Sequence, residues 1–171
     1  MRGMRTPWSR AELRFIETLS PKDDFKLKVR TLRTLMDEWC GSGPLYVYVA
    51  DGARSAEDQL AKWRVGRVET SPGVWKVVGK TITKAPPGSS AHEVALAADL
   101  GVVDSMDTAS RADDAWVPDY VRNTDGTIEV HPAWAKLGEY AKTLGLQTGL
   151  HWKRPWDFGH VEHPDWKTLG R

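Results

Sequence analysis

The chain has 171 residues, of which 40% are hydrophobic and 27% are charged, and its formal net charge at pH 7 is +1. This composition excludes a disordered chain, and the length fits one domain, residues 1–171, without room for a second large module. The single cysteine, Cys40, excludes an intramolecular disulfide, and no apolar stretch approaches the length needed to cross a bilayer.

The N-terminal part, residues 1–44, is predicted to be helical. Ser9 and Glu12 form a capping box ahead of a short apolar stripe, which indicates a first helix. Ser20–Pro21 is predicted to start a second helix, with the serine as N-cap and the proline in the first turn. Apolar residues then recur at helical spacing until residues 41–44, Gly-Ser-Gly-Pro, end the pattern.

Positive charge is concentrated at the start of the chain. Residues 1–33 hold nine Lys or Arg against four acidic residues. This segment is either an ordinary solvated surface or a region that draws the protein to an anionic cell envelope. Residues 1–5 are basic but no apolar run follows them, so we expect no signal peptide, synthesis in the cytoplasm and no stable insertion into a membrane.

The middle of the chain is predicted to place one strand before a helix. Residues 45–50 are rich in aromatic and β-branched side chains and read as a strand. It ends where residues 52–55, Gly-Ala-Arg-Ser, begin. Arg54 is therefore expected at the end of a strand, which is a common place for functional side chains. Residues 55–66 then read as a capped helix with Leu60 and Trp63 facing inward.

A long excursion follows, over residues 67–89. It contains two Pro-Gly turn signals and is predicted to form a hairpin around Gly79 and to border a site. Residues 94–103 are almost wholly apolar, which is typical of a buried strand.

The last third begins with a polar, acidic insertion over residues 104–130. A hairpin closed at residues 123–126 is predicted within it, and residues 132–144 are predicted to be the last helix. Residues 104–129 hold seven acids against two Arg, and four of these acids would permit a calcium ion without the spacing of a recognised loop: Asp104, Asp107, Asp113 and Asp114.

Two polar segments contain the candidate chemistry. His92 is followed seven residues later by Asp99, and Asp157 stands three residues before His160. Two imidazoles and a carboxylate are the ligands of a catalytic Zn²⁺ that keeps a fourth position open for water. Asp157 is then a spare carboxylate that can take a proton. Because seven is odd, a straight strand would point His92 and Asp99 to opposite faces, so the chain must turn between them.

Each of these residues also has a simpler interpretation. Asp99 could simply pair with a buried arginine, Asp157 could form a turn, and Arg54 could be a salt-bridge partner. An unpaired carboxylate in an apolar strand would cost several kcal/mol, which favours a metal ion as the partner of Asp99. Among the other histidines, His131 reads as a helix cap, His151 lies near the expected groove, and His163 reads as a surface residue or as a residue behind a ligand.

The order of the motifs resembles that of the D-alanyl-D-alanine metallopeptidases, and most of all their L-alanoyl-D-glutamate endopeptidase branch, found in many phage endolysins. The resemblance runs from about residue 45 to residue 163. Beyond the four residues of the two polar segments it rests on Gly52–Ser55, Glu57, Gln59, Gly66–Arg67, Ile82–Ala85, Gly88–Ser90, His131–Trp134, Leu144–Leu146 and Trp152. The chain departs from the family at Ala95, where Gly is usual, at Ala53, where an aromatic residue is usual, and at Val161, where Phe is common.

The resemblance implies an α+β fold with helices packed on a small antiparallel sheet and one zinc site. It implies zinc held by His92, Asp99 and His160, with Asp157 as the general base. Arg54 would stabilise an oxyanion or hold a substrate carboxylate.

The same resemblance implies a substrate and its contacts. Ser90, Gln59 and Trp152 are candidates for substrate binding, and Trp156 for a groove wall. The implied substrate is the peptidoglycan stem peptide, cut between L-Ala and D-Glu, which gives wall lysis once the membrane is permeabilised. We expect a monomer without a separate wall-binding domain and without a nucleic-acid partner.

Two other functions remain open. One is a D,D-carboxypeptidase or dipeptidase that acts on D-Ala termini. The other is a catalytically inactive wall-binding domain, against which the spare carboxylate of Asp157 argues.

Overall fold

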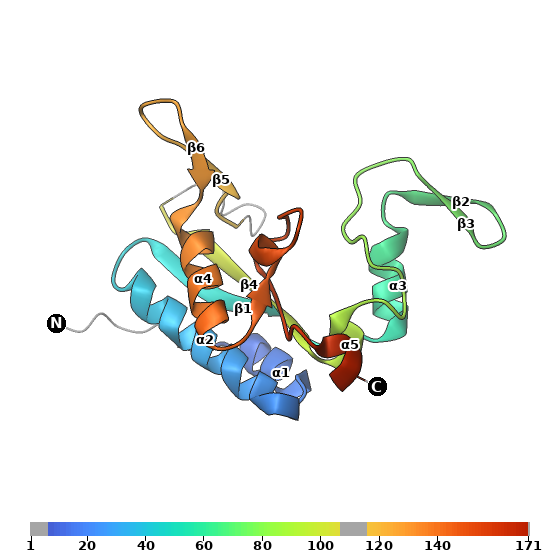
Figure 1. Ribbon diagram of the computed structural model, residues 1–171, viewed down its shortest axis with the longest axis horizontal. Helices are drawn as coiled ribbons and strands as arrows, with labels where there is room; N and C mark the ends of the chain where they lie inside the picture. Colours follow the sequence, from blue (N-terminus) through green and yellow to red (C-terminus); the bar gives the residue numbers. More distant parts are fainter. Residues whose placement is uncertain (1–6, 107–115, 171) are drawn as a thin grey trace.

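The computed structural model describes residues 7–106 and 116–170 (Figure 1). Its main sheet is small and antiparallel, with helices packed on it, so the predicted α+β class is confirmed. The four strands lie in the order β1 (Leu45–Asp51), β4 (Ala97–Asp104), β8 (His160–Glu162) and β7 (Gln147–Thr148). Strand β4 therefore lies at the centre, between the predicted strand and the segment that carries the last histidine.

Three helices cover this sheet and form the core with it. They are α1 (Arg10–Thr18), α2 (Phe25–Cys40) and α4 (Pro132–Thr143). Figure 1 shows α1 and α2 side by side beneath β1 and β4. The helices, the sheet and the loop before β8 together bury large side chains in this core, among them Phe25, Leu32, Val47, Leu100, Trp134 and Phe158. Among the described residues, no helix is long and apolar enough to cross a bilayer.

The predicted capping box of the first helix is confirmed. The Ser9 hydroxyl accepts from the Glu12 amide at 3.1 Å, and the Glu12 carboxylate accepts from the Ser9 amide at 2.8 Å. Glu12 is buried, and its other oxygen accepts from the Val49 amide and from the Arg33 guanidinium, both at 3.1 Å. One carboxylate thus joins α1 to the sheet and to α2.

The predicted start of the second helix is wrong by several residues. Ser20 accepts from the Lys22 amide, but a short 3₁₀ turn, η1 (Lys22–Asp24), intervenes before the α-helix begins at Phe25. Asp23 and Asp24 have φ of 48° and 55°, in the left-handed region, so the helical path cannot run through them. The capping signal at Ser20 is real but belongs to this turn.

The predicted helix over residues 55–66 is confirmed as α3 (Ala56–Arg64), with Ser55 as its N-cap. Its inward residue is Gln59, which is fully buried. Leu60 and Trp63 were predicted to face inward, but both are only half-buried and lie outside the core. The apolar side of α3 does not pack on the main sheet. The chain continues from the end of this helix into a hairpin.

This hairpin consists of β2 (Arg67–Ser71) and β3 (Val74–Val77). Its turn lies at Pro72–Gly73, where Gly73 has a φ of 77°, and not around Gly79 as predicted. Gly79 instead lies at the base of the hairpin, where its amide donates to the carbonyl of Gly66.

The turn required between His92 and Asp99 is present. His92 lies in a 3₁₀ turn, η2 (Ala91–Val94), and the chain reverses at Ala95 before it enters β4. Ala95 has φ 60° and ψ 26°, which is the left-handed conformation. The glycine usual at this position in the resembling family would adopt this backbone conformation without a Cβ penalty.

Replacing Ala95 by Gly is therefore expected to stabilise the fold. The free energy of unfolding should rise by about 0.5–1 kcal/mol. Glycine removes the cost of holding Ala in the left-handed conformation, and part of this gain is offset because glycine makes the unfolded chain more flexible. Urea unfolding measures it. Ala61→Gly, at an exposed position in α3, is the matched control and should lose about 1 kcal/mol. Equal losses in the two variants would show that Ala95 is not strained.

The C-terminal elements follow the prediction with one addition. The expected hairpin is β5 (Tyr120–Arg122) with β6 (Ile128–Val130), closed by a turn in which the Gly126 amide donates to the Asn123 carbonyl. His131 caps α4 through its ring nitrogen, as predicted. Helix α4 is not the last, because the short α5 (Trp166–Leu169) follows β8. Five residues of the charge-based predictions lie outside the described residues: Arg2, Arg5, Asp107, Asp113 and Asp114.

Candidate metal centre and active-site pocket

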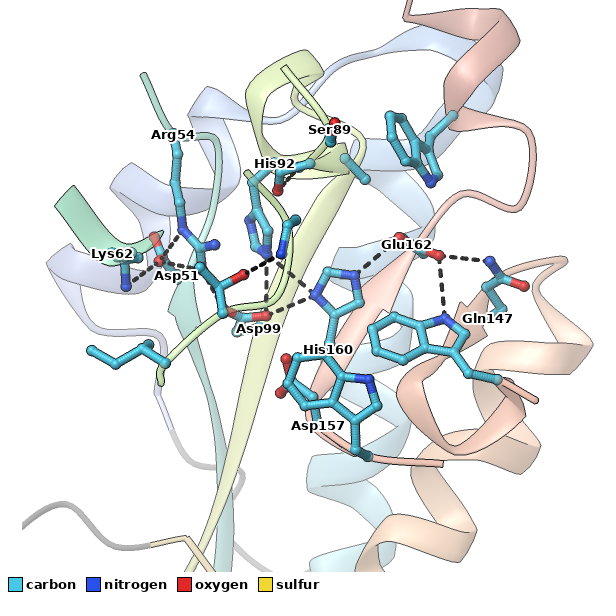
Figure 2. A pocket seen from close by; sticks show the side chains of 18 of the residues that line it. Asp51, Arg54, Lys62, Ser89, His92, Asp99, Gln147, Asp157, His160 and Glu162 are labelled. Carbon is cyan, nitrogen blue, oxygen red and sulfur yellow. Dashed lines mark hydrogen bonds and ion pairs between the residues drawn. The ribbon is translucent and has the colours of Figure 1, made fainter. Parts of the chain in front are cut away.

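Strand pairing brings the predicted ligands together. Asp99 on β4 is directly opposite His160 on β8 and opposite Asp51 on β1. His92 reaches the same point from η2, just before β4 begins. Figure 2 shows the two imidazoles and the Asp99 carboxylate converging on one point. His92 and His160, which are 68 positions apart in the chain, are thus neighbours because β8 pairs with β4.

Three atoms of these residues form a nearly equilateral triangle. His92 Nε2 lies 3.3 Å from Asp99 Oδ1 and 3.3 Å from His160 Nδ1, and the third side, His160 Nδ1 to Asp99 Oδ1, is 3.2 Å. Both imidazoles are buried. In the described part of the chain, this is the group of His, Cys, Asp and Glu side chains placed to hold a metal ion.

The backbone fixes the orientation of His92. Its Nδ1 lies 2.6 Å from the carbonyl oxygen of Gly52. A carbonyl can only accept, so Nδ1 carries a proton and Nε2 is the ring nitrogen that faces Asp99 and His160. Position 52 must be glycine, because a Cβ there would lie 2.7 Å from the carbonyl oxygen of Phe15 and from the Thr18 hydroxyl.

His160 is oriented by a buried carboxylate that the sequence reasoning missed. Glu162 Oε2 lies 3.1 Å from His160 Nε2, the ring nitrogen that faces away from the triangle. Glu162 is itself held by the Gln147 amide at 2.7 Å and by the Trp152 indole at 3.3 Å. The alternation of a strand gives a signal that could have found it, because residues two apart share a face.

Replacing Glu162 by Gln should therefore weaken metal binding while the three ligands remain. Loss of such a carboxylate behind a ligating imidazole typically costs 10- to 100-fold in metal affinity. Competition with a fluorescent chelator measures the dissociation constant. Glu139→Gln, an exposed change on α4, is the control and should leave the affinity unchanged. If Glu162→Gln binds the metal as tightly as the wild type does, Glu162 does not orient His160 for metal binding.

Electrostatic interactions hold the triangle together. Burial disfavours charge on Asp99, but the charge of His92 and hydrogen bonds from both imidazoles keep the pKa of this carboxyl well below its usual range. Burial also opposes a charged His160, yet its contacts with Asp99 and Glu162 raise the pKa of the imidazole to about 10. Two carboxylates, Asp99 and Glu162, therefore face the His160 imidazole from opposite sides.

Arg54 lies immediately behind Asp99. One of its terminal nitrogens donates to Asp99 Oδ2 at 2.7 Å, and its Nε donates to Asp51 Oδ2 at 2.9 Å. Asp99 therefore does both things that the sequence suggested. Its Oδ2 pairs with an arginine, and its Oδ1 faces the two imidazoles. Arg54 also borders the cavity described below, and direct contact with substrate stays a prediction.

Asp157 lies beside the triangle, in the tight turn that leads into β8. Its φ is 54°, and the Asp157 carbonyl accepts from the His160 amide at 3.0 Å. Burial, with the negative charge of Asp99, raises the pKa of the Asp157 carboxyl to about 6. Gly149 packs against this turn so closely that any Cβ would overlap the carbonyl oxygens of Trp156 and Asp157. The backbone therefore holds the spare carboxylate in place.

These residues line one cavity of about 670 Å³. The predicted substrate contacts Ser90 and Trp152 border it, and so does the predicted wall residue Trp156. Gln59 does not reach it, because its side chain is fully buried, donates to the Ala85 carbonyl at 2.8 Å and accepts from Arg54. Part of the excursion borders the cavity as predicted, at Ile82, Thr83, Ala85 and Ser89.

Two further histidines lie apart from the cavity. His163 is buried and not on the surface, because its Nε2 pairs with Asp23 Oδ2 at 2.7 Å. His151 is exposed, and its ring accepts from the Thr148 amide at 3.0 Å, so it caps the 3₁₀ turn η3 (Gly149–His151).

Comparison with known proteins places this geometry in context. No protein-family model matches the chain. The peptidoglycan L-alanyl-D-glutamate endopeptidase CwlK of Bacillus subtilis (strain 168) is 30% identical over 116 residues, which are 68% of this chain. The chain spans 59% of the length of CwlK.

A solved structure shares the fold. The crystal structure of the Serratia marcescens L-Ala D-Glu endopeptidase ChiX matches with a TM-score of 0.52 and 13% sequence identity, over 98% of this chain and 96% of ChiX. The resemblance to the L-alanoyl-D-glutamate endopeptidases that the ordered motifs indicate is therefore confirmed, in sequence by CwlK and in fold by ChiX.

Proposed function

We propose that the chain is a zinc-dependent peptidoglycan endopeptidase that cleaves the stem peptide between L-Ala and D-Glu. The observation that carries this proposal is the triangle of His92, Asp99 and His160 with the unligated carboxylate of Asp157 beside it in one cavity. The activities for which CwlK and ChiX are named support this choice of bond and substrate.

The triangle fits zinc in particular. Nitrogen and oxygen ligands about 2.0–2.1 Å from a tetrahedral zinc ion lie roughly 3.3 Å apart, and the three sides observed are 3.2, 3.3 and 3.3 Å. Three ligands leave a fourth position open, as in catalytic sites. The chemistry that zinc supplies when bound is Lewis acidity, which makes water a usable nucleophile near neutral pH.

The residues of the chain supply the proton transfers. Asp157 takes a proton from the attacking water and delivers it to the amine that leaves, and a pKa of about 6 suits a base that must be ionised near neutrality. Arg54 holds the Asp99 carboxylate in place through an ion pair to its Oδ2, the oxygen that faces away from the imidazoles. Its guanidinium also borders the cavity, where it can attract a carboxylate of the substrate.

The cavity walls suit a peptide that carries carboxylates. Trp152 and Trp156 pack on each other, with ring centroids 5.5 Å apart, and give one side an aromatic wall. Lys84 lies 4.2 Å from the centroid of the Trp156 ring, and Lys62 and Lys167 border the cavity. These cations match the free carboxylate that D-Glu contributes to the stem peptide.

Digestion of purified muropeptides, followed by mass spectrometry, tests the proposal. Cleavage between L-Ala and D-Glu leaves L-Ala on the muramic acid and releases a peptide that begins with D-Glu. Release of free D-Ala would identify a D,D-carboxypeptidase or dipeptidase instead. Wall binding without any fragment would identify an inactive wall-binding domain. His160→Ala is the control for contaminating hydrolases.

The biological role that we propose is lysis of a bacterial host by a monomeric enzyme of phage type. A protein made in the cytoplasm would reach its substrate only after the membrane is permeabilised. Lysis of cells from outside, compared with and without a permeabilising agent, tests this order of events.

A further inference from the structure

Residues 62–84 form a projecting arm. It consists of the end of α3, the β2–β3 hairpin and the segment that returns to the cavity wall. Figure 1 shows it extending away from the main sheet and its helices. None of its residues belongs to the hydrophobic core. From Val68 to Lys80 every side chain except that of Trp75 is exposed.

The arm carries apolar side chains that it does not bury. Of the twelve exposed large hydrophobic residues in the described part of the chain, six lie in its 18 residues from position 65 to 82. Their exposed fractions range from 41 to 60%: Val65, Val68, Val74, Val77, Val78 and Ile82. Single exposed apolar residues are ordinary, but half of those in the described part of the chain lie on this one projection, which indicates a surface that another surface covers.

The arm is also strongly basic. Apart from Lys62 and Lys84, which lie toward the cavity, it contains four Lys or Arg and a single acid, Glu69. The Glu69 carboxylate accepts from the Gly73 amide at 2.7 Å, so it is engaged in the hairpin turn. Lys76 is opposite Val68 in the hairpin, and Arg67 is opposite Val77, so each face combines cationic and apolar groups.

Aromatic packing keeps the arm in shape before it meets a partner. The Trp63 and Trp75 rings pack edge to face with centroids 5.2 Å apart. Arg67 lies over Trp63 at 4.8 Å and donates to the Thr83 carbonyl at 3.1 Å, which ties the hairpin to the returning segment. A preformed surface loses little conformational entropy on binding.

We propose that this arm binds the surface of an anionic phospholipid bilayer. Lys and Arg near such a surface are attracted by its negative potential, and exposed valines can enter the headgroup boundary. A second copy of the chain would bring the same positive charge against itself. A soluble polyanion would leave the valines uncovered. The proposal concerns surface attachment and is independent of the activity of the metal site.

Sedimentation with vesicles tests it. The whole protein should bind vesicles of phosphatidylglycerol and phosphatidylethanolamine far more than vesicles of phosphatidylcholine, and the bound fraction should fall as salt rises. Lys76→Gln with Lys80→Gln should weaken binding by about thirtyfold, roughly fivefold for each charge removed. Val74→Asp with Val77→Asp should also reduce it at least tenfold, because aspartate cannot enter the boundary.

Ile128→Asp is the matched control, since Ile128 is 61% exposed on the other hairpin, and it should bind as the wild type does. Equal binding to neutral and anionic vesicles overturns the proposal, and so does wild-type binding by both arm variants. Polyphosphate that binds the wild type and binds Lys76→Gln with Lys80→Gln more weakly, while no vesicle binds the wild type, would make the arm a polyanion site instead. Cleavage of a soluble stem peptide by these variants reports separately on the proposed enzyme.

Discussion

Alanine in place of His92, Asp99 or His160 should remove bound zinc and abolish peptide cleavage together. Each residue supplies one corner of the triangle, and two remaining ligands do not hold a catalytic zinc ion at the dilution of an assay. Metal content after gel filtration and the rate of muropeptide cleavage measure the two losses. The residual rate should be indistinguishable from that of buffer.

His151→Ala is the matched control for this series. Its imidazole is exposed and lies outside the cavity, so zinc content and rate should stay near those of the wild type. Circular dichroism shows whether each variant folds. A folded variant of any of the three ligands that retains one zinc per chain would contradict the assignment of that ligand.

Asp157→Asn is expected to separate metal binding from catalysis. The amide keeps the size of the side chain but cannot accept a proton, and Asp157 is not a corner of the triangle. The rate should fall by about 10²- to 10⁴-fold, the usual contribution of a positioned general base. Zinc content and the affinity for stem peptide should be unchanged. Single-turnover cleavage of a labelled muropeptide measures the chemical step.

Asp119→Asn, at an exposed position before β5, is the control for the amide substitution. Cleavage by Asp157→Asn at close to the wild-type rate would exclude Asp157 as the base. Loss of zinc from this variant would instead make it a ligand, and the division of roles between Asp99 and Asp157 would have to be revised.

The order of the motifs, and its resemblance to a known family, was sufficient to predict that three distant side chains lie close enough to hold a metal ion. His92, Asp99 and His160 could be selected without knowing the strand order. Asp51 was missed because its role depends on the pairing of β1 with β4, which no short motif encodes. Glu162 lies two residues after His160, so strand alternation alone could have found it. Gln59 was expected at the substrate, but its contacts with Arg54 and with the Ala85 carbonyl, which bury it, depend on tertiary packing that its position in α3 does not reveal.

Local signals also failed where the backbone takes an uncommon conformation. A serine followed by proline predicted the second helix too early because Asp23 and Asp24 occupy left-handed conformations that non-glycine residues rarely adopt. The hairpin turn was placed at Gly79 although Pro72–Gly73 is the stronger turn signal.

The hydrogen bond between His92 and the Gly52 carbonyl couples folding to the metal. Gly52 packs on the end of α1, where the Thr18 hydroxyl accepts from the Ala53 amide at 3.0 Å. An ion that binds only the native triangle draws the folding equilibrium toward the native state by mass action, by about 4 kcal/mol at a thousand times its dissociation constant. With the metal bound as proposed, the N-terminal helix would share in that free energy although it is remote from the cavity, and the supply of metal would affect how long the protein survives proteolysis.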